Sequence, residues 1–368
     1  MILKTISLEN FRLHKNTSLN FSNHLNYIVG GNGQGKTSLL EAIYYLCTSK
    51  NLNRNSDNEA VSFEEKYFKV YGEFLSRINN KVEIRFENTS RKKVININDK
   101  PIYRTSQIIG KFPVVTLTQP DHAITLGAPA DRRKFVDSVI TQASTAYLKN
   151  LLEYGKILRQ RAILLNLYKE KRTSQIENEL STWTEMLIRS GAEIVRHRIA
   201  FIVEFNEYLT SSYKEIINDL EEPSIEYEYL NMEKAVEETF IESLADYRDE
   251  EIRKGMNLFG PHRDEFSFRI NGRELKKYGS QGQHKTFQIS LRFGEFFYLS
   301  DKLGEAPLFL LDDVFGELDE FRARRISNYL KKIGQAFLTL TDITKFDSLT
   351  KTSEDFLINI ASGKAVYA

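Results

Sequence analysis

Eight residues near the start of the chain have the types and the spacing that bind a nucleotide phosphate. The string "GGNGQGKT", residues 30 to 37, matches the pattern G-x-x-x-x-G-K-[ST] and stands between the strand-like "LNYIV" and the helix-like "KTSLLEAIYYLCTS". Glycines let the backbone approach an anion closely, and a helix N-terminus favours negative charge. The alternative interpretation is a glycine turn that only connects two core elements.

The phosphate-loop interpretation gives each position a role. Backbone N–H groups of residues 31 to 35 would surround the β-phosphate, Lys36 would reach the β- and γ-phosphates, and the Thr37 hydroxyl would ligate Mg²⁺. We therefore predict an ATP and Mg²⁺ site whose loop residues are Gly30, Gly31, Asn32, Gly33, Gln34, Gly35, Lys36, Thr37 and Ser38.

Two adjacent acids supply the second part of such a site. The string "LFLLDD", residues 308 to 313, is an apolar run that ends in Asp312 and Asp313. A strand of this kind is buried in a parallel sheet, and ligands bind at the carboxyl ends of its strands. Asp312 is predicted to be the second protein ligand of Mg²⁺, and Asp313 to activate the attacking water beside Lys36.

A second polar turn lies between these two motifs. The string "YGSQGQHKT", residues 278 to 286, places Ser280 and Gly282 at the head of another helix. A hydroxyl, a glycine and a fresh helix N-terminus can hold a γ-phosphate. The alternative is an ordinary loop with an N-cap serine.

The elements that position these motifs change in type along the chain. From residue 1 to about 118, short alternating runs predict strands. From about 130 to 255, apolar residues at helical spacing predict two long helices joined by the polar "KEKRTSQ", and the apolar stripe of the second helix is interrupted at Ser190 and Gly191. After residue 257, "EFSFRI" and "RELKKY" predict a hairpin around Asn271 and Gly272, and strands then alternate with helices.

This order predicts the fold. Alternating strands and helices imply a parallel sheet. We predict an α/β head built from both ends of the chain, with an inserted helical lobe: residues 1–125 and 256–368 form the head, and residues 126–255 form the lobe.

Composition narrows the class of protein. The chain has 368 residues, of which 41% are apolar, as is typical of a globular protein. Its 51 Lys and Arg nearly balance its 50 Asp and Glu, so its net charge does not attract a polyanion. The single Cys47 lies in an apolar run, so a packed thiol is expected. The N-terminus lacks the apolar core of a signal peptide, and no run approaches the ~18 apolar residues of a membrane helix. A cytoplasmic setting is expected.

The order of the motifs resembles that of ABC-type ATPase heads, which include the SMC proteins. A phosphate loop is followed by S-x-G-Q, by a hydrophobic strand with two acids, and by "GELD" at 316 to 319. More closely, the chain resembles the RecF family of bacterial DNA replication and repair proteins, through "LENFR", "GAPADRRKFVD", "YGKILRQRAILL", "GPHRDEFSF", "YGSQGQHKT" and "LLDDVFGELD".

The resemblance implies a composite site. Ser280, Gly282 and Gln283 would contact ATP held by the Lys36 of a second subunit, so that ATP binding closes a homodimer. Arg12 matches a position that reaches the nucleotide phosphates, and Asp319 matches the loop that crosses the dimer seam. Gln119 stands near the position of the glutamine that links Mg²⁺ to the adjoining lobe.

The resemblance also implies partners and a slow reaction. The expected partners are double-stranded DNA near single-strand gaps and RecR, which with RecO loads RecA. Asp313 replaces the glutamate usual in transporters, and Thr341 and Asp342 stand in place of a switch histidine, so we expect weak ATP hydrolysis that acts as a reset. The candidate DNA contacts are the basic clusters "DRRK" at 131, "RHR" at 196, "RKK" at 91 and "RARR" at 322, whose alternative role is a solvated surface.

Three other classes of protein share parts of this pattern. A transporter ATPase subunit has the same head but needs an LSGGQ-like turn, a switch histidine and a membrane partner. An SMC-like tether needs a much longer helical insertion. A small-molecule P-loop kinase needs no signature turn and leaves residues 279 to 283 unexplained.

Overall fold

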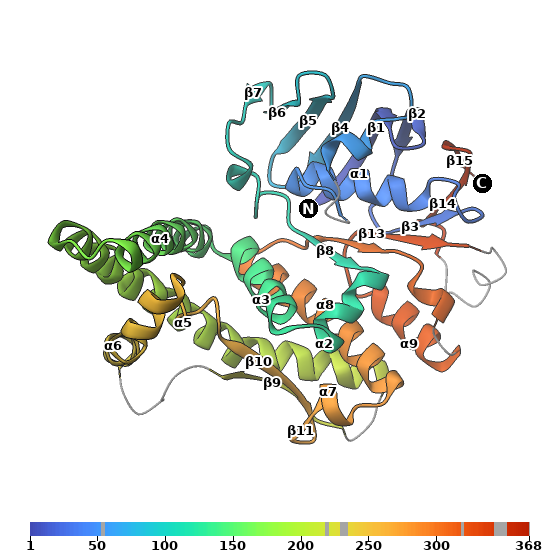
Figure 1. Cartoon of the computed structure of the whole chain (residues 1–368). Helices are drawn as coiled ribbons and strands as arrows, with labels where there is room; N and C mark the ends of the chain where they lie inside the picture. Colours follow the sequence, from blue (N-terminus) through green and yellow to red (C-terminus); the bar gives the residue numbers. More distant parts are fainter. Residues whose placement is uncertain (53–55, 218–220, 229–234, 318–319, 342–351, 368) are drawn as a thin grey trace. The chain divides into compact units, whose positions relative to one another are not determined.

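The computed structural model describes residues 1–52, 56–217, 221–228, 235–317, 320–341 and 352–367 (Figure 1). The chain forms two compact units, which are described separately. Unit 1 contains residues 1–121, 211–220 and 288–368, and unit 2 contains residues 122–210 and 221–287. The proposed boundaries at 125 and 255 come from sequence composition, and they stay a prediction.

The nucleotide motifs lie on a six-stranded sheet of unit 1. Its order is β15-β14-β3-β13-β12-β8, and every neighbouring pair is parallel except the edge pair β14 and β15. The parallel sheet predicted from the alternation of strands and helices is confirmed. Its strands are β3 (Leu25–Val29), β8 (Val114–Leu117), β12 (Leu308–Leu311), β13 (Ala336–Leu340), β14 (Phe356–Ala361) and β15 (Lys364–Tyr367).

A second, antiparallel sheet of unit 1 packs with the first around one helix. Helix α1 (Lys36–Thr48) contacts β1, β4 and β5 of the antiparallel sheet and β13 of the parallel one. Both sheets turn apolar side chains towards it, and Cys47 lies buried in this core, as expected. The antiparallel strands are β2 (His14–Asn20), β1 (Ile2–Phe11), β4 (Tyr67–Leu75), β5 (Asn79–Glu87), β6 (Lys92–Ile97) and β7 (Lys100–Pro101).

Shorter elements complete unit 1. Helix α9 (Glu320–Leu330) links β12 to β13, and helix α8 (Gln281–Leu303) contributes its residues from Gln288 onward. The 3₁₀ turns are η1 (Asp57–Ala60), η2 (Thr105–Gln107), η3 (Gln119–Asp121) and η4 (Val314–Glu317).

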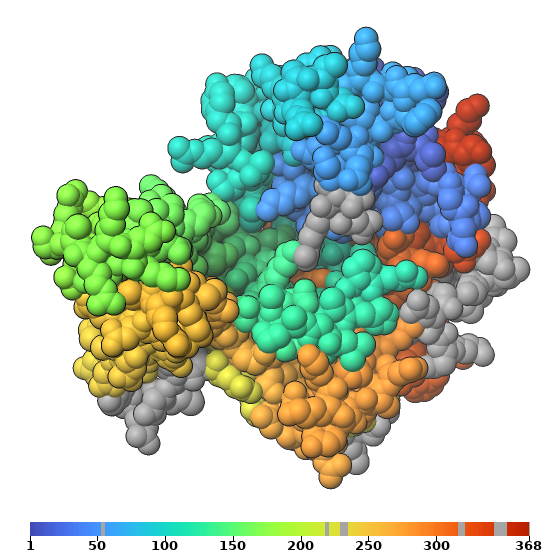
Figure 2. Space-filling view, viewed as in Figure 1, coloured from blue at the N-terminus to red at the C-terminus, as the bar shows by residue number. Residues whose placement is uncertain are grey.

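Unit 2 is built on a helical hairpin. Helix α4 (Thr145–Glu170) and helix α5 (Ser174–Ile217) run antiparallel, with Arg161 bonded to Thr184 near the tip and Asn150 bonded to Ser190 near the base. Helix α6 (Val236–Lys254) lies against α4, in gold beside the green hairpin of Figure 2. The other elements are α2 (His122–Leu126), α3 (Pro129–Ala143), β9 (Pro223–Glu228), β10 (Glu265–Ile270), β11 (Arg273–Glu274) and α7 (Leu275–Tyr278).

The local predictions in this part of the chain have different outcomes, and the helical prediction is wrong for residues 223–228. Helix α5 continues through Ser190 and Gly191, where its apolar stripe is interrupted, and a Cβ on Gly191 would lie 2.5 Å from the Phe240 ring. The predicted hairpin around Asn271 and Gly272 is confirmed, because β10 pairs with β11, but "RELKKY" contributes only a two-residue strand before helix α7. Strand β9, inside the stretch predicted to be helical, pairs with β10.

None of the helices in the described ranges combines the length and the apolar character needed to cross a membrane.

Candidate nucleotide-binding site

Three neighbouring strands bring the predicted nucleotide residues to one edge of the sheet. Strands β3, β13 and β12 are adjacent and parallel, so their carboxyl ends lie side by side. The phosphate loop follows β3, Thr339 and Thr341 stand at the end of β13, and Asp312 and Asp313 follow β12. Residues that are about 275 positions apart along the chain therefore meet, as the hydrogen bond between Thr37 and Asp312 shows.

The phosphate loop runs directly into a helix. Gly35 is the N-cap of α1 with a φ of 110°, and Gly33 has a φ of 72°. These backbone angles favour glycine. Gly30 has a second requirement, because a Cβ there would lie 2.3 Å from the Ile360 carbonyl oxygen. Gly30, Gly33 and Gly35 thus meet conformational or spatial constraints of this fold.

Lys36 lies across the mouth of the loop. Its ammonium donates to the carbonyl oxygens of Gly30 at 2.7 Å and Gly31 at 2.8 Å. Burial lowers the pKa of Lys36, and the nearby carboxylates of Asp313 and Asp312 oppose this shift. A phosphate would give this buried cation a stronger, charged acceptor.

The tandem acids are held by two threonines. The Thr37 hydroxyl lies 3.0 Å from both carboxylate oxygens of Asp312, and the Thr339 hydroxyl donates to Asp312 Oδ1 at 2.8 Å. The same Thr339 oxygen accepts from the backbone N–H of Asp313 at 2.8 Å. Asp313 has a φ of 51°, a left-handed conformation that few residues adopt. Mg²⁺ prefers oxygen ligands, so the Thr37 hydroxyl and the Asp312 carboxylate fit this ion.

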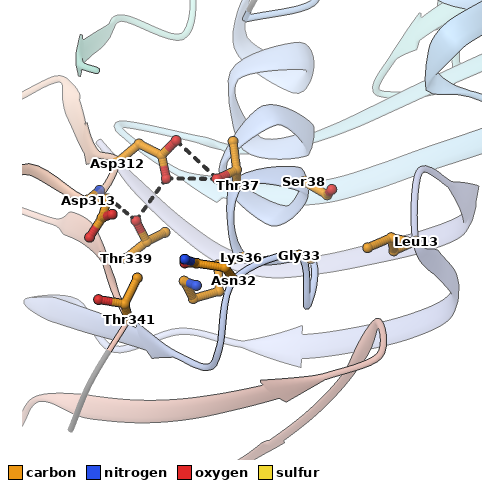
Figure 3. A pocket seen from close by; sticks show the side chains of 11 residues that line it. Leu13, Asn32, Gly33, Lys36, Thr37, Ser38, Asp312, Asp313, Thr339 and Thr341 are labelled. Atoms are coloured by element: carbon orange, nitrogen blue, oxygen red, sulfur yellow. Dashed lines mark hydrogen bonds between the residues drawn. The ribbon is translucent and has the colours of Figure 1, made fainter. Parts of the chain in front are cut away.

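A cavity of about 180 Å³ joins these groups (Figure 3). The Lys36 side chain extends from the loop towards the side of the cavity where Asp313, Thr339 and Thr341 lie. The residues that line the cavity are Leu13, Asn32, Gly33, Gly35, Lys36, Thr37, Ser38, Asp312, Asp313, Thr339 and Thr341. Leu13 and Thr339 were not among the predicted site residues. Thr339 alternates with Thr341 in the string "FLTLT", and that pattern could have indicated it.

Other predicted site residues lie outside this cavity. Arg12 makes a bidentate ion pair with Glu41, at 2.8 and 2.9 Å, and donates to the Glu59 carbonyl. Gln34 is engaged by the turn after β14, where the Ser362 N–H donates to its side-chain oxygen at 2.6 Å. Gly30 and Gly31 contribute the carbonyl groups that hold Lys36. Asp319 and Asp342 lie outside the described residues.

Gln119 lies in a turn whose last residue joins an ion-pair cluster. It begins turn η3 directly after β8, and Asp121 at the end of that turn is buried. Arg292 of α8 donates to both carboxylate oxygens of Asp121 and to Glu295. This ion-pair cluster ties the segment after β8 to α8, and no sequence pattern had indicated it.

The second polar turn, residues 278–286, is called the signature turn here, and it belongs to unit 2. Ser280 and Gln283 form a reciprocal capping box: the Ser280 N–H donates to Gln283 Oε1 at 2.8 Å, and the Gln283 N–H donates to Ser280 Oγ at 3.2 Å. The Gln283 amide also donates to Glu221 at 2.7 Å, and Gly282 lies inside this first helical turn. The Ser280 hydroxyl accepts here, so its own hydrogen can donate to a phosphate oxygen.

Most of the basic clusters predicted to bind DNA are engaged within the fold. Arg198 is 2% exposed and pairs with Asp137 and Asp264, and Arg132 is 7% exposed and pairs with Glu265. The others have these partners: Arg133 donates to the Asp264 carbonyl, Arg196 pairs with Glu193 and Glu237, Lys93 pairs with Asp57, and Arg325 donates to the Glu215 carbonyl. Buried Arg132 and Arg198 stabilise unit 2 and cannot reach a DNA phosphate.

Comparisons with known proteins agree with this geometry. A family model described as an AAA domain matches residues 5–346. The DNA replication and repair protein RecF of Chloroherpeton thalassium is 38% identical over 356 residues, 94% of this chain and 96% of that protein. The RecF of Bacillus pumilus is 32% identical over 374 residues and spans both chains completely.

Solved structures show the same fold. A structure of the recombination mediator protein RecF with ATP has a TM-score of 0.89 at 30% identity, and it covers 100% of this chain and 97% of that one. The Smc head of Pyrococcus furiosus, at 14% identity and a TM-score of 0.58, covers 100% of this chain and 96% of that one and shares the fold alone.

The fold and the order of these motifs along the chain define an ATPase head of the ABC and SMC type. Within that class, the chain belongs to the RecF family of DNA replication and repair proteins.

Proposed function

We propose that this protein is an ATP-dependent DNA-binding switch of recombinational repair and replication restart. ATP with Mg²⁺ closes a homodimer on duplex DNA near single-strand gaps, and slow hydrolysis reopens it. The observation that carries the proposal is the meeting of Lys36, Thr37 and Asp312 at one cavity.

The residues of unit 1 support phosphate binding. The N-terminus of α1 would receive the β-phosphate and Lys36 the γ-phosphate. Thr37 and Asp312 would hold Mg²⁺, which neutralises phosphate charge when it is bound. Asp313 would orient and deprotonate the attacking water. The strain of its left-handed backbone and its short side chain agree with weak ATPase activity.

The signature turn supports dimerisation. Its Ser280 hydroxyl hydrogen, its Gly282 backbone and its helix N-terminus form an anion site that the chain's own phosphate loop does not need. A second subunit would place this turn on the nucleotide held by Lys36, with Arg12 and Asp319 near the seam. Two ATP molecules would then hold the two subunits together.

Family membership supports the partners. The chain is similar to a protein described as a recombination mediator of the RecFOR pathway, so we propose RecR, acting with RecO and RecA, as its functional partners. Gapped double-stranded DNA is the proposed substrate, and the cytoplasm is the proposed location. A transporter subunit or an SMC-like tether fits less well, because the helical hairpin of α4 and α5 is short and the family match covers nearly the whole chain.

The proposal is tested by DNA binding with and without ATP. We expect the wild-type protein to bind gapped duplex more tightly with ATP and Mg²⁺ than without them, and Lys36→Ala to lose that difference. Lys50→Ala, at an exposed lysine, is the matched control and should behave as wild type. Equal affinity of the wild-type protein for gapped DNA in the two conditions would contradict the proposed switch.

A further inference from the structure

We propose that the turn between β14 and β15, together with His14, positions the phosphate-binding amides of the loop. We call His14, Thr17, Ser362 and Gly363 the loop brace. This inference rests on the proposed binding of ATP, and it assigns a role in that binding to the C-terminal end of the described chain.

The turn holds Gln34 from two sides. The Gly363 N–H donates to the Gln34 carbonyl oxygen at 2.9 Å, and the Ser362 N–H donates to the Gln34 side-chain oxygen at 2.6 Å. The Thr17 hydroxyl donates to the Gly363 carbonyl at 3.1 Å, which ties the turn to strand β2. Loop, turn and strand therefore form one hydrogen-bonded group.

His14 holds the next peptide. Its Nε2 lies 3.0 Å from the Gly35 carbonyl oxygen, which also accepts the first helical bond, from the Leu39 N–H at 3.1 Å. A carbonyl can only accept, so Nε2 carries a hydrogen. His14 is fully buried, and burial lowers its pKa. Its Nδ1 lies 3.1 Å from the hydroxyl oxygen of Thr17, the residue that donates to Gly363.

Peptide planarity carries this effect to the phosphate side. In a trans peptide the carbonyl group and the next N–H group point in opposite directions. Fixing the Gln34 carbonyl therefore orients the Gly35 N–H, and fixing the Gly35 carbonyl orients the Lys36 N–H. These are amides that a phosphate loop directs at its anion. The brace acts on them from the opposite side.

Close packing leaves the turn little freedom. Gly363 has a φ of 73°, and a Cβ there would lie 2.0 Å from the Leu13 carbonyl oxygen. Strand β15 also contacts β2, and the Tyr367 hydroxyl donates to the Asn20 carbonyl at 2.9 Å. Figure 1 labels the two strands. A displaced turn would therefore displace the loop.

The test measures nucleotide affinity in two substitutions at one position. His14→Leu removes the bond to Gly35, and we expect the dissociation constants of ATP and ADP to rise together by about tenfold, the equivalent of one hydrogen bond. His14→Gln keeps an N–H donor and should stay within about twofold of wild type. AMP affinity should not change, because the oriented amides face the β-phosphate. His24→Leu, at an exposed histidine, is the matched control.

The outcomes are distinguishable. A wild-type protein that does not bind ATP contradicts the proposed function, whereas a folded His14→Leu protein that binds ATP as tightly as wild type overturns the brace. If His14→Leu does not fold, amide hydrogen exchange in the wild-type protein decides. We expect ATP and ADP to slow exchange at Gly363, because its N–H donates to the loop. Unchanged exchange at Gly363 in a protein saturated with ATP also overturns the brace.

Discussion

Replacement of Thr339 tests whether one hydroxyl organises the tandem acids. Thr339 is 1% exposed, and its oxygen both donates to Asp312 and accepts from the Asp313 N–H, each at 2.8 Å. Thr339→Val preserves the shape of the side chain and removes both bonds. The Asp313 amide then loses its acceptor, and its left-handed backbone loses a restraint.

The size of the effect follows from these two bonds. A hydrogen bond to a charged group contributes about 1.5–3 kcal/mol, and an unsatisfied buried donor costs about 1–3 kcal/mol. We expect the poorer orientation of the two acids to raise the activation free energy of hydrolysis by about 2 kcal/mol, which corresponds to a rate roughly 30-fold lower. Single-turnover hydrolysis of radiolabelled ATP at saturating Mg²⁺ should slow by about that factor in Thr339→Val, while ATP affinity without Mg²⁺ stays unchanged.

Thr339→Ser is the matched control, because it retains the hydroxyl. It should hydrolyse ATP within about threefold of wild type, a difference of well under 1 kcal/mol. Equal rates of ATP hydrolysis by Thr339→Val and Thr339→Ser would contradict this role of the Thr339 hydroxyl.

Three further predictions concern stability and DNA binding. Arg12→Ala leaves the buried Glu41 carboxylate without its ion-pair partner, so the free energy of unfolding should fall by about 3 kcal/mol. Urea titrations without nucleotide measure this, and an unchanged midpoint of urea unfolding would contradict it. Burial lowers the pKa of His262 to about 4, below the value of about 6.5 expected in the unfolded chain. Between these two pH values the unfolded chain binds more protons than the folded protein, so the free energy of unfolding should fall by about 1 kcal/mol per pH unit as the pH drops. His262→Gln should flatten this dependence. The logarithm of DNA affinity should fall with the logarithm of salt concentration by about 0.9 per phosphate contact, and a flat response would argue against a phosphate-binding surface.

The sheet and its phosphate loop were predictable because their signals are local. A strand buried on both faces is a largely apolar run, as in β12 and, apart from Asn26, in β3, and the residues that follow such strands meet at one edge of a parallel sheet. The positions of Lys36, Thr37 and Asp312 follow from these two facts and from motif spacing. Their roles in binding and hydrolysis stay predictions.

The remaining features depend on contacts between distant residues. Strands β14 and β15 were not predicted, and β15 in particular is a short, largely exposed edge strand without a buried face. Arg198 and Arg132 looked like a DNA-binding surface because a run of letters does not show which cations are buried against carboxylates. The brace of Gln34 by Ser362 joins residues 328 positions apart, and no local pattern records it.

Sedimentation velocity of the wild-type protein and Ser280→Arg, with and without ATP and Mg²⁺, tests the central claim most directly. We predict that wild type is a monomer without ATP and a dimer with it, and that Ser280→Arg binds ATP but stays monomeric, because the arginine fills the space that the partner's nucleotide needs. Ser181→Arg, on an exposed helix surface, should dimerise as wild type does. A Ser280→Arg protein that dimerises normally with ATP would contradict the account.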